Sequence, residues 1–483
     1  MMPVSLEKFN EVYLRVKCEP SVGKELSEFF TFEVPNSRFM PSVRSRVWDG
    51  RVRLFSPATG KIYLGLLPYV RRFLAEQGYK IEYGEGIVPP RKLDRNLTKK
   101  FVRKLEKGIR TRDYQIDAIH NILENDRGLI LSPTGSGKSF IIYALVRYYI
   151  QKFDDKKILI IVPSTGLVEQ MFNDFADYGW FPDEYCHKLY AGSDKNTPRE
   201  VVISTWQSIY KLDKKYFSQF GAVFVDEAHQ AKAKSITGIM TKLHECKYRI
   251  GLTGTLDGTE VHRLVLEGLF YKHKRVTTTS QLIARKQLSN LHIRCLVLDH
   301  IKEHRQKLRY PDEMDFLATL PSRNVFISKL AATTDGNILI LAQYIKQLEA
   351  ITLILKEISD RTVFFVYGGT PTEDREEIRS IVEKEDDVIV VASYGVFSQG
   401  INIKRLHNIV FASPYKSQIK VLQSIGRGLR VADDKEQLNV FDIVDDLSYN
   451  NRENYTLKHF KERVKIYNEQ EFDYDIIPVK LKS

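Results

Sequence analysis

The chain has 483 residues, of which 43% are hydrophobic and 28% are charged, and its formal net charge is +12. This length suits about three domains with cores of their own, and the composition excludes collagen-like, disordered and disulfide-stapled proteins. No apolar run approaches the ~20 residues of a membrane span, no secretory signal is expected, and four scattered cysteines indicate buried thiols in a reducing compartment.

Residues 1–90 are predicted to form a small basic α+β domain that binds nucleic acid. The first 112 residues contain 23 basic and 12 acidic side chains, a net charge of +11, which leaves about +1 for the rest. A polyanionic partner explains this asymmetry, and a solvated basic face is the alternative. We expect a strand at 51–55 and a helix at 67–76. The candidate contacts with nucleic acid are Arg44, Arg46, Arg51 and Arg53, which surround Trp48 and Phe55. We expect Trp48 and Phe55 to lie in the core of this small domain, and stacking on unpaired bases is the alternative.

From residue 113, short apolar strands alternate with helical stretches, which is typical of parallel sheets covered by helices. The pattern occurs twice, so we predict an α/β protein with two tandem parallel-sheet domains, at 91–290 and 291–445, and a helical extension at 446–483. The predicted strands of the first sheet are 128–131, 158–162, 201–204, 222–225 and 248–252. Those of the second sheet are 338–341, 363–366, 388–392, 409–411 and 440–443.

A glycine-rich segment between the first of these strands and a helix has the pattern of a phosphate-binding loop. Its glycines allow backbone amides to approach phosphates closely. Lys138 is expected to contact the β- and γ-phosphates of ATP, and the Ser139 hydroxyl to bind Mg²⁺. Ser132 stands where the strict pattern has glycine, which is a mild departure. The candidate ATP-binding residues of the loop are Thr134, Gly135, Ser136, Gly137, Lys138 and Ser139.

A second motif, which is acidic, follows the strand predicted at 222–225. Asp226 and Glu227 lie where a parallel strand ends, at the sheet edge that binds ligands in α/β proteins. We expect Asp226 to bind Mg²⁺ and Glu227 to orient and deprotonate the attacking water. Together with the phosphate-binding loop, this pair predicts ATP hydrolysis.

These motifs resemble those of superfamily 2 helicases and translocases, and further motifs follow in that order along residues 112–430. The segments 112–115, 162–170, 204–208, 253–255, 391–402 and 423–430 resemble, in turn, the adenine-reading element, the strand-binding motifs and motifs III, V and VI. The resemblance implies two RecA-like domains that close on ATP. Asn402 departs from many relatives, which have Asp there.

The same resemblance implies roles for individual residues. Arg427 and Arg430 would stabilise charge on the γ-phosphate as arginine fingers. Arg112, Gln115 and Gly400 would contact ATP. Coupling of hydrolysis to movement would involve His229, Thr253, Thr255 and Gln423, and nucleic-acid contacts would come from Pro163, Ser164, Thr205 and Gln207.

Residues 36–39 and 48–54 resemble a more specific family, the recombination and repair helicases of T4-like bacteriophages. This implies an ATP-driven enzyme of the host cytoplasm that remodels forks, Holliday junctions, D-loops and R-loops. The implied partners are single-stranded and branched DNA, with RNA–DNA hybrids and a single-strand-binding protein as further candidates. The chain is expected to act as a monomer and not to associate with a membrane. Two alternatives stay open: an RNA helicase acting on RNA duplexes, and an ATP-gated module that anneals or binds strands without unwinding.

Overall fold

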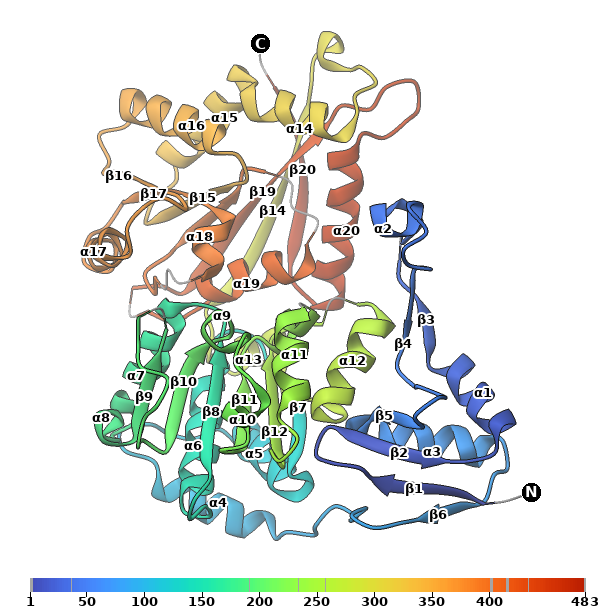
Figure 1. Cartoon of the computed structure of the whole chain (residues 1–483). Coiled ribbons are helices and arrows are strands. Elements are labelled where there is room, and N and C mark those ends of the chain that lie inside the picture. The colour runs from blue at the N-terminus through green and yellow to red at the C-terminus, as the bar shows by residue number, and fades with distance from the viewer. Residues whose placement is uncertain are drawn as a thin grey trace. The chain divides into compact units, whose positions relative to one another are not determined.

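The computed structural model describes residues 3–35, 37–190, 192–232, 234–256, 258–399, 403–413, 417–432 and 434–481. The chain forms two compact units, which we call unit 1 (Met1–Ser132 and Gly137–Val276) and unit 2 (Pro133–Ser136 and Thr277–Ser483). Each unit contains a seven-stranded sheet (Figure 1). The described cysteines are free thiols. No helix of the described ranges is long and apolar enough to cross a membrane.

The N-terminal part of unit 1 is a four-stranded sheet in the order β5-β2-β1-β6, with a separate two-stranded ribbon, β3-β4. The ribbon leads to the short helix α2 (Figure 1). The helix predicted at 67–76 is confirmed as α3. The elements are β1 (Val4–Lys8), β2 (Tyr13–Lys17), α1 (Pro20–Phe29), β3 (Thr31–Glu33), α2 (Pro41–Arg44), β4 (Arg51–Arg53), β5 (Lys61–Tyr63), α3 (Leu67–Glu76) and β6 (Ile81–Tyr83).

The large sheet of unit 1 has the order β13-β7-β12-β11-β8-β10-β9, and every neighbouring pair is parallel. Its central strands are fully buried because helices cover both faces: Ile158 and Ile160 join one core cluster, and Leu159 and Ile161 the other. All five predicted strands are present. The strands are β7 (Arg127–Leu131), β8 (Lys157–Val162), β9 (Cys186–Leu189), β10 (Val201–Thr205), β11 (Phe220–Val225), β12 (Tyr248–Thr253) and β13 (His273–Arg275).

The helices of this part of unit 1 mostly cross from one strand to the next. α4 and α5 precede β7, and α6 follows the phosphate-binding loop. Their bounds are α4 (Arg95–Lys104), α5 (Asp113–Asn125), α6 (Lys138–Ile150), α7 (Thr165–Asp177), α8 (Pro182–Tyr185), α9 (Trp206–Ile209), α10 (Lys214–Phe217), α11 (Lys234–Lys242) and α12 (Glu260–Phe270).

The N-terminal sheet and the large sheet of unit 1 share packing at α12. Leu264 belongs to the core cluster of the N-terminal sheet. A Cβ placed on Gly65 would lie 2.1 Å from the carbonyl oxygen of Glu267, and one on Gly268 would lie 2.8 Å from the Tyr63 side chain. Glycine is therefore required at both positions for the backbones to approach this closely. The N-terminal sheet is therefore in direct contact with α12 at these positions.

Unit 2 contains the sheet β16-β17-β15-β18-β19-β14-β20, again with parallel neighbours throughout. The five predicted strands are confirmed, β14 and β20 are additional, and the predicted terminal helix is α20. The strands are β14 (Asn290–Asp299), β15 (Ile338–Ala342), β16 (Val363–Val366), β17 (Ile389–Ser393), β18 (Asn408–Phe411), β19 (Gln437–Asp446) and β20 (Tyr474–Lys480). The helices are α13 (Thr279–Ala284), α14 (Tyr310–Thr319), α15 (Pro321–Ala332), α16 (Ile345–Ile358), α17 (Thr372–Val382), α18 (Tyr394–Gln399), α19 (Gln418–Gly428) and α20 (Tyr455–Glu469).

The predicted fold class is confirmed: the chain has two parallel-sheet domains of RecA-like type and a small N-terminal domain whose helices accompany a sheet of mixed strand direction.

Candidate active site

The phosphate-binding loop connects β7 to α6, as its sequence predicted. Gly135 and Gly137 have φ values of +80° and +79°, in the left-handed region that other residues rarely adopt. A Cβ on Gly137 would also lie 2.4 Å from the Gln115 side-chain nitrogen, so this glycine allows a close approach as well as the turn. Inside the loop, the Ser136 hydroxyl donates to the Pro133 carbonyl at 2.6 Å. The loop is therefore shaped to turn its amides towards an anion at the start of α6.

A chain of polar contacts runs from this loop through the acidic motif. The Lys138 ammonium lies 3.3 Å from the Ser132 carbonyl oxygen and 3.8 Å from a carboxylate oxygen of Glu227. The other Glu227 oxygen lies 3.2 Å from His229 Nδ1, and that nitrogen lies 2.8 Å from the Thr253 hydroxyl. The Thr253 hydroxyl donates to the Thr255 carbonyl at 3.0 Å. The structure thus brings the predicted catalytic and coupling residues of unit 1 into one contact chain.

The strand ends explain why these residues meet. Thr253 pairs in register with Leu131, so motif III leaves the sheet beside the phosphate-binding loop. A backbone hydrogen bond of 2.9 Å from Ser132 to Thr253 fixes that alignment. Asp226 directly follows β11, the other neighbour of β12. The carboxyl ends of three adjacent parallel strands therefore converge on one place, as expected for a ligand site of an α/β sheet.

The acidic pair has the electrostatics of a cation-binding position. Burial, followed by the neighbouring Glu227 carboxylate, raises the pKa of Asp226 to about 6, while Lys138 acts to lower it. The Glu227 backbone has φ 49°, and its N–H donates to Asp226 Oδ1 at 2.9 Å. The Ser139 hydroxyl lies 2.8 Å from the Tyr178 hydroxyl, a partner that the sequence motif does not indicate. A buried carboxylate and a hydroxyl are hard oxygen donors of the type that Mg²⁺ prefers.

The residues that resemble an adenine-reading element cap α5. The Gln115 side-chain oxygen accepts from the Arg112 backbone N–H at 2.9 Å, and its amide nitrogen lies 3.4 Å from the Gly137 carbonyl oxygen. The Arg112 guanidinium donates to the Tyr114 hydroxyl at 2.8 Å. Gln115 consequently joins the start of α5 to the phosphate-binding loop, which is a structural role in addition to the predicted contact with ATP.

The predicted strand-binding residues of unit 1 lie side by side at the ends of β8 and β10. Thr205 pairs in register with Val162, so the loops that follow both strands are neighbours. The Gln207 side chain donates to the Pro163 carbonyl at 3.3 Å, and Ser164 is the N-cap of α7. Polar side chains and helix N-termini of this kind contact phosphates without reading base sequence.

Unit 2 carries the predicted arginine fingers. Arg427 lies in the last turn of α19, Arg430 follows its end, and Gln423 lies one turn earlier. Lys435, which sequence reasoning missed, is buried against this end of α19: its ammonium donates to the Gly428 carbonyl and, at 3.2 Å, to the Arg430 carbonyl. Burial lowers the pKa of Lys435 to about 7, against the effect of Asp434. Gly400 and Asn402, predicted for motif V, lie outside the described residues.

The N-terminal arginines are exposed. Arg44 ends α2, Arg46 follows it, and Arg51 and Arg53 flank the middle residue of β4. Phe55 is buried in the small core, as predicted. The prediction that Trp48 also lies in that core is wrong: it is half-buried, and its indole N–H donates to the Arg51 carbonyl at 3.0 Å. Residues 37–50 around α2, which we call the N-terminal tip, also expose Phe39 by 63% and Val47 by 82%. The tip is therefore a basic surface interleaved with apolar side chains.

Two parallel sheets, a phosphate-binding loop and an acidic motif joined to motif III define a P-loop ATPase of the superfamily 2 helicase class. Three family models match the chain: "DNA helicase UvsW, N-terminal" at residues 3–84, "Type III restriction enzyme, res subunit" at 108–258, and "Helicase conserved C-terminal domain" at 322–432. The chain is 36% identical to the ATP-dependent DNA helicase uvsW of Enterobacteria phage T4, over 97% of this chain and 98% of that protein. The chain therefore belongs to the UvsW family of DNA helicases, which confirms the phage helicase resemblance.

One solved structure and one more distant relative are also similar to this chain. The crystal structure of T4 UvsW matches all of both chains, with 34% identity and a TM-score of 0.53. The "DNA 3'-5' translocase XPB2" of Sulfurisphaera tokodaii is 23% identical over 68% of this chain and 80% of its own. As a member of an ATP-dependent DNA helicase family, the chain is an enzyme that uses a nucleotide and binds DNA.

Proposed function

We propose that this chain is an ATP-dependent helicase and translocase that remodels branched DNA, namely forks, Holliday junctions, D-loops and R-loops, in phage recombination, repair and replication control. The observation that carries the proposal is the contact chain from Lys138 through Glu227 and His229 to Thr253. It gives a direct physical route from the place where phosphate would bind to motif III. Membership of the UvsW family supports DNA as the substrate.

The residues of the site have distinct tasks in ATP hydrolysis. Lys138 would hold the β- and γ-phosphates, and Glu227 would orient the attacking water and accept its proton. Loss of the γ-phosphate would remove the charge beside Lys138 and Glu227. The contact of Glu227 with His229, and through it the contact of His229 with Thr253, would then change. Arg427 and Arg430 of unit 2 would stabilise the γ-phosphoryl charge on closure.

Ser139 and Asp226 are the residues that would hold Mg²⁺. Bound there, the ion would neutralise phosphate charge. The Asp226 carboxylate is suited to this because it is buried next to a second carboxylate and would gain from a cation.

Several finer features belong to the same proposal. The division into residues 1–90, 91–290, 291–445 and 446–483 would separate a DNA-binding block, two motor domains and an extension. We propose RNA–DNA hybrids and a single-strand-binding protein as additional partners, a monomer as the active form, and the host cytoplasm as its location.

The proposal is tested by measuring ATP hydrolysis without nucleic acid and with single-stranded, duplex, forked and four-way DNA, R-loops and duplex RNA. Strand separation or branch migration is followed in the same samples. We expect the strongest stimulation with branched DNA, accompanied by strand movement. Stimulation by RNA alone would favour the RNA helicase, and DNA binding without hydrolysis would favour the ATP-gated binding module.

Removal of two positive charges at the N-terminal tip is expected to weaken fork binding. Arg44→Ser with Arg46→Gly is a suitable variant, because Arg46 has φ 58° and glycine keeps that conformation. If each arginine contacts one phosphate, the slope of log affinity against log salt falls by about 2. Fluorescence anisotropy with a forked DNA at several salt concentrations measures this slope.

The matched control removes two exposed lysines from α20, Lys461→Ser with Lys465→Ser. It changes the net charge equally and should leave the salt slope of fork binding unchanged. Equal slopes for the tip variant and the wild type would refute DNA contact by the tip.

A further inference from the structure

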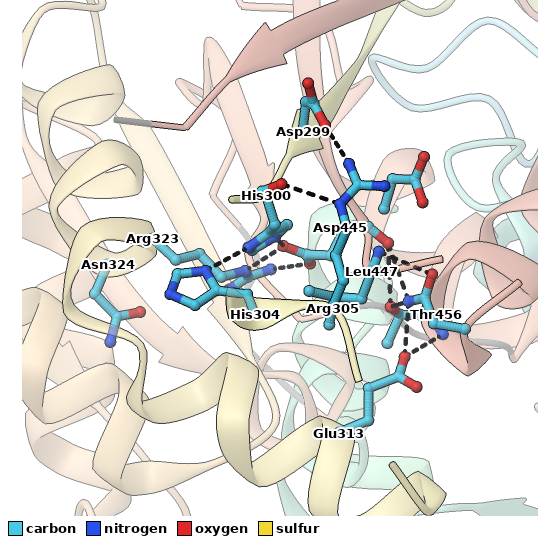
Figure 2. A network of polar contacts seen from close by, with 12 residues as sticks. Asp299, His300, His304, Arg305, Glu313, Arg323, Asn324, Asp445, Leu447 and Thr456 are labelled. Carbon is cyan, nitrogen blue, oxygen red and sulfur yellow. Dashed lines mark hydrogen bonds and ion pairs between the residues drawn. The ribbon is translucent and has the colours of Figure 1, made fainter. Parts of the chain in front are cut away.

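A buried ion-pair network lies at the carboxyl ends of β14 and β19 in unit 2 (Figure 2). Arg323 of α15 donates to both carboxylate oxygens of Asp445, at 2.8 and 2.9 Å. His300 Nε2 lies 3.0 Å from the first of these oxygens. The side chains of Asp445 and His300 are 0% exposed, and that of Arg323 is 1% exposed. A charged pair this deep in a protein persists only where its geometry is closely satisfied.

The network keeps its central carboxylate ionised. Burial alone would raise the pKa of Asp445, but the Arg323 charge and the hydrogen bonds from His300 and Arg323 outweigh burial and lower this pKa to about 2. Asp445 is therefore a permanent anion at neutral pH, and it fixes the direction of the Arg323 fork.

The same guanidinium reaches the segment that leads into motif VI. Arg323 Nη2, which bonds Asp445, also donates to the Ala412 carbonyl at 2.8 Å. The next residue, Ser413, donates from its hydroxyl to Gln347 at 2.8 Å and accepts from the Gln343 backbone N–H at 3.0 Å. Its carbonyl accepts from the Tyr394 hydroxyl at 3.0 Å. Groups from α15, α16, α18 and the end of β15 thus hold two consecutive residues after β18.

The arginine-bearing helix α19 begins shortly after this two-residue segment. Ser413 precedes Gln418, the first residue of α19, by only five positions, and α19 carries Gln423 and Arg427. A displacement of Ala412 and Ser413 would move the start of the helix and hence the arginine in its last turn. The Arg323 side chain is buried, so its effect on hydrolysis would pass through α19.

The network also connects the segment 299–320 with the start of the C-terminal extension. Glu313 of α14 accepts from the Tyr455 and Thr456 backbone N–H groups at the start of α20, at 3.0 and 2.7 Å (Figure 2 shows Glu313 and Thr456). A carboxylate at that position stabilises a helix N-terminus. Asn454 bonds both Glu313, at 2.9 Å, and the Asp445 carbonyl, at 3.1 Å. The segment 299–320 and the C-terminal extension are therefore hydrogen-bonded at the end of β19, where Asp445 holds Arg323.

We propose that Arg323, anchored by Asp445, is a positioning residue for the arginine-bearing helix α19 and thereby for ATP hydrolysis. The inference rests on the proposed function, since it assumes that Arg427 acts on ATP. It differs from the predicted motifs because Arg323 lies outside all of them.

The test compares Arg323→Lys with the matched control Arg361→Lys. Lysine at position 323 can keep a cation against Asp445 but lacks the fork that contacts Asp445 twice and Ala412 as well. Arg361 is also an arginine of unit 2 that holds backbone, with donors to the carbonyls of Ala331, Thr334, Gly336 and Asp387. Those contacts lie before β15 and β17, at the opposite ends of the strands. Thermal unfolding of both variants measures the loss of stability that the two substitutions share.

We expect Arg323→Lys to lower kcat for DNA-stimulated ATP hydrolysis by about 10-fold, with KM for ATP within about twofold, because a small misplacement of a catalytic group mainly affects the chemical step. Arg361→Lys should retain kcat within about twofold of the wild type. In an Arg427→Ala background, Arg323→Lys should have less than about twofold further effect, since residues that act through one another are not additive.

The outcomes separate this inference from the proposed function. If the wild type does not hydrolyse ATP with any DNA, the proposed function fails. If the wild type is active but Arg323→Lys and Arg361→Lys have equal kcat, only the positioning role fails. An undiminished effect of Arg323→Lys in the Arg427→Ala background would also overturn it.

Discussion

Replacing Lys138 with alanine is expected to lower the kcat of DNA-stimulated ATP hydrolysis by about 10³-fold or more, while the affinity for DNA stays within about twofold. Lys138 is the cation between the Ser132 carbonyl and the Glu227 carboxylate, and its removal leaves phosphate charge without its partner. The candidate DNA contacts at Gln207 and Pro163 lie after other strands and keep their geometry. Steady-state hydrolysis and anisotropy binding on the same preparation measure both quantities.

Lys156→Ala is the matched control for this prediction. Lys156 lies in the same unit, where its ammonium contacts the Ser218 carbonyl at 2.7 Å and Glu245 at 3.0 Å. Its loss should leave turnover unchanged. Turnover by Lys138→Ala at the rate of this control would show that the glycine-rich loop does not bind the nucleotide phosphates.

Arg427→Ala is expected to reduce kcat by about 10³-fold with a smaller effect on KM for ATP, as for arginine fingers in related NTPases. Arg427 lies in the last turn of α19, whose end is held by the buried Lys435. The helix should therefore fold without the arginine, so that the loss reports on chemistry. ATP titrations at saturating forked DNA give kcat and KM separately.

Two further variants sharpen the arginine experiment. Arg379→Ala removes a partly exposed arginine of α17 that pairs with Glu376, and it should behave like the wild type. Arg427→Lys keeps the charge without the fork and should recover only part of the lost kcat. If Arg427→Ala hydrolysed ATP as fast as Arg379→Ala, Arg427 would have no part in the chemistry.

The interior strands were predictable from the sequence, and several of the others were not. Strands such as β8 and β15 are buried on both faces and appear as short apolar runs. β9, β13 and β20 lie at sheet edges and contain polar or charged residues, so they lack the apolar run by which the edge strand β16 was found. β14 was missed for another reason, because the predicted boundary between the two sheets fell on it. Its two end residues are exposed although the strand pairs with both β19 and β20.

The candidate site divides in a similar way. Residues within one motif, such as Gly135 and Lys138, carry their signal locally, because the chemistry requires that spacing. Contacts between distant segments leave no such local signal in the sequence. Tyr178 at Ser139 and Arg323 at Asp445 are ordinary residue types in unremarked stretches, 39 and 122 positions from their partners. Trp48 shows a different error: an aromatic residue was expected in a core, but Trp48 lies in the loop between α2 and β4 and its indole N–H donates to the Arg51 carbonyl there.

The contact of Gly65 and Gly268 with the neighbouring backbone and side chains has a consequence for how this protein can be altered. The N-terminal block completes its own interior with Leu264 of the motor, and Glu11 accepts from buried Arg127 through its carbonyl at 3.0 Å. Residues 1–90 are therefore not an independent domain that can be transferred alone. If residues 1–90 were grafted onto another helicase, their core would contain a cavity in place of Leu264. In the chain from which they were removed, the Arg127 guanidinium would lose its hydrogen bond to the Glu11 carbonyl. A transplant of residues 1–90 that keeps their packing would have to include α12 and β7 as well.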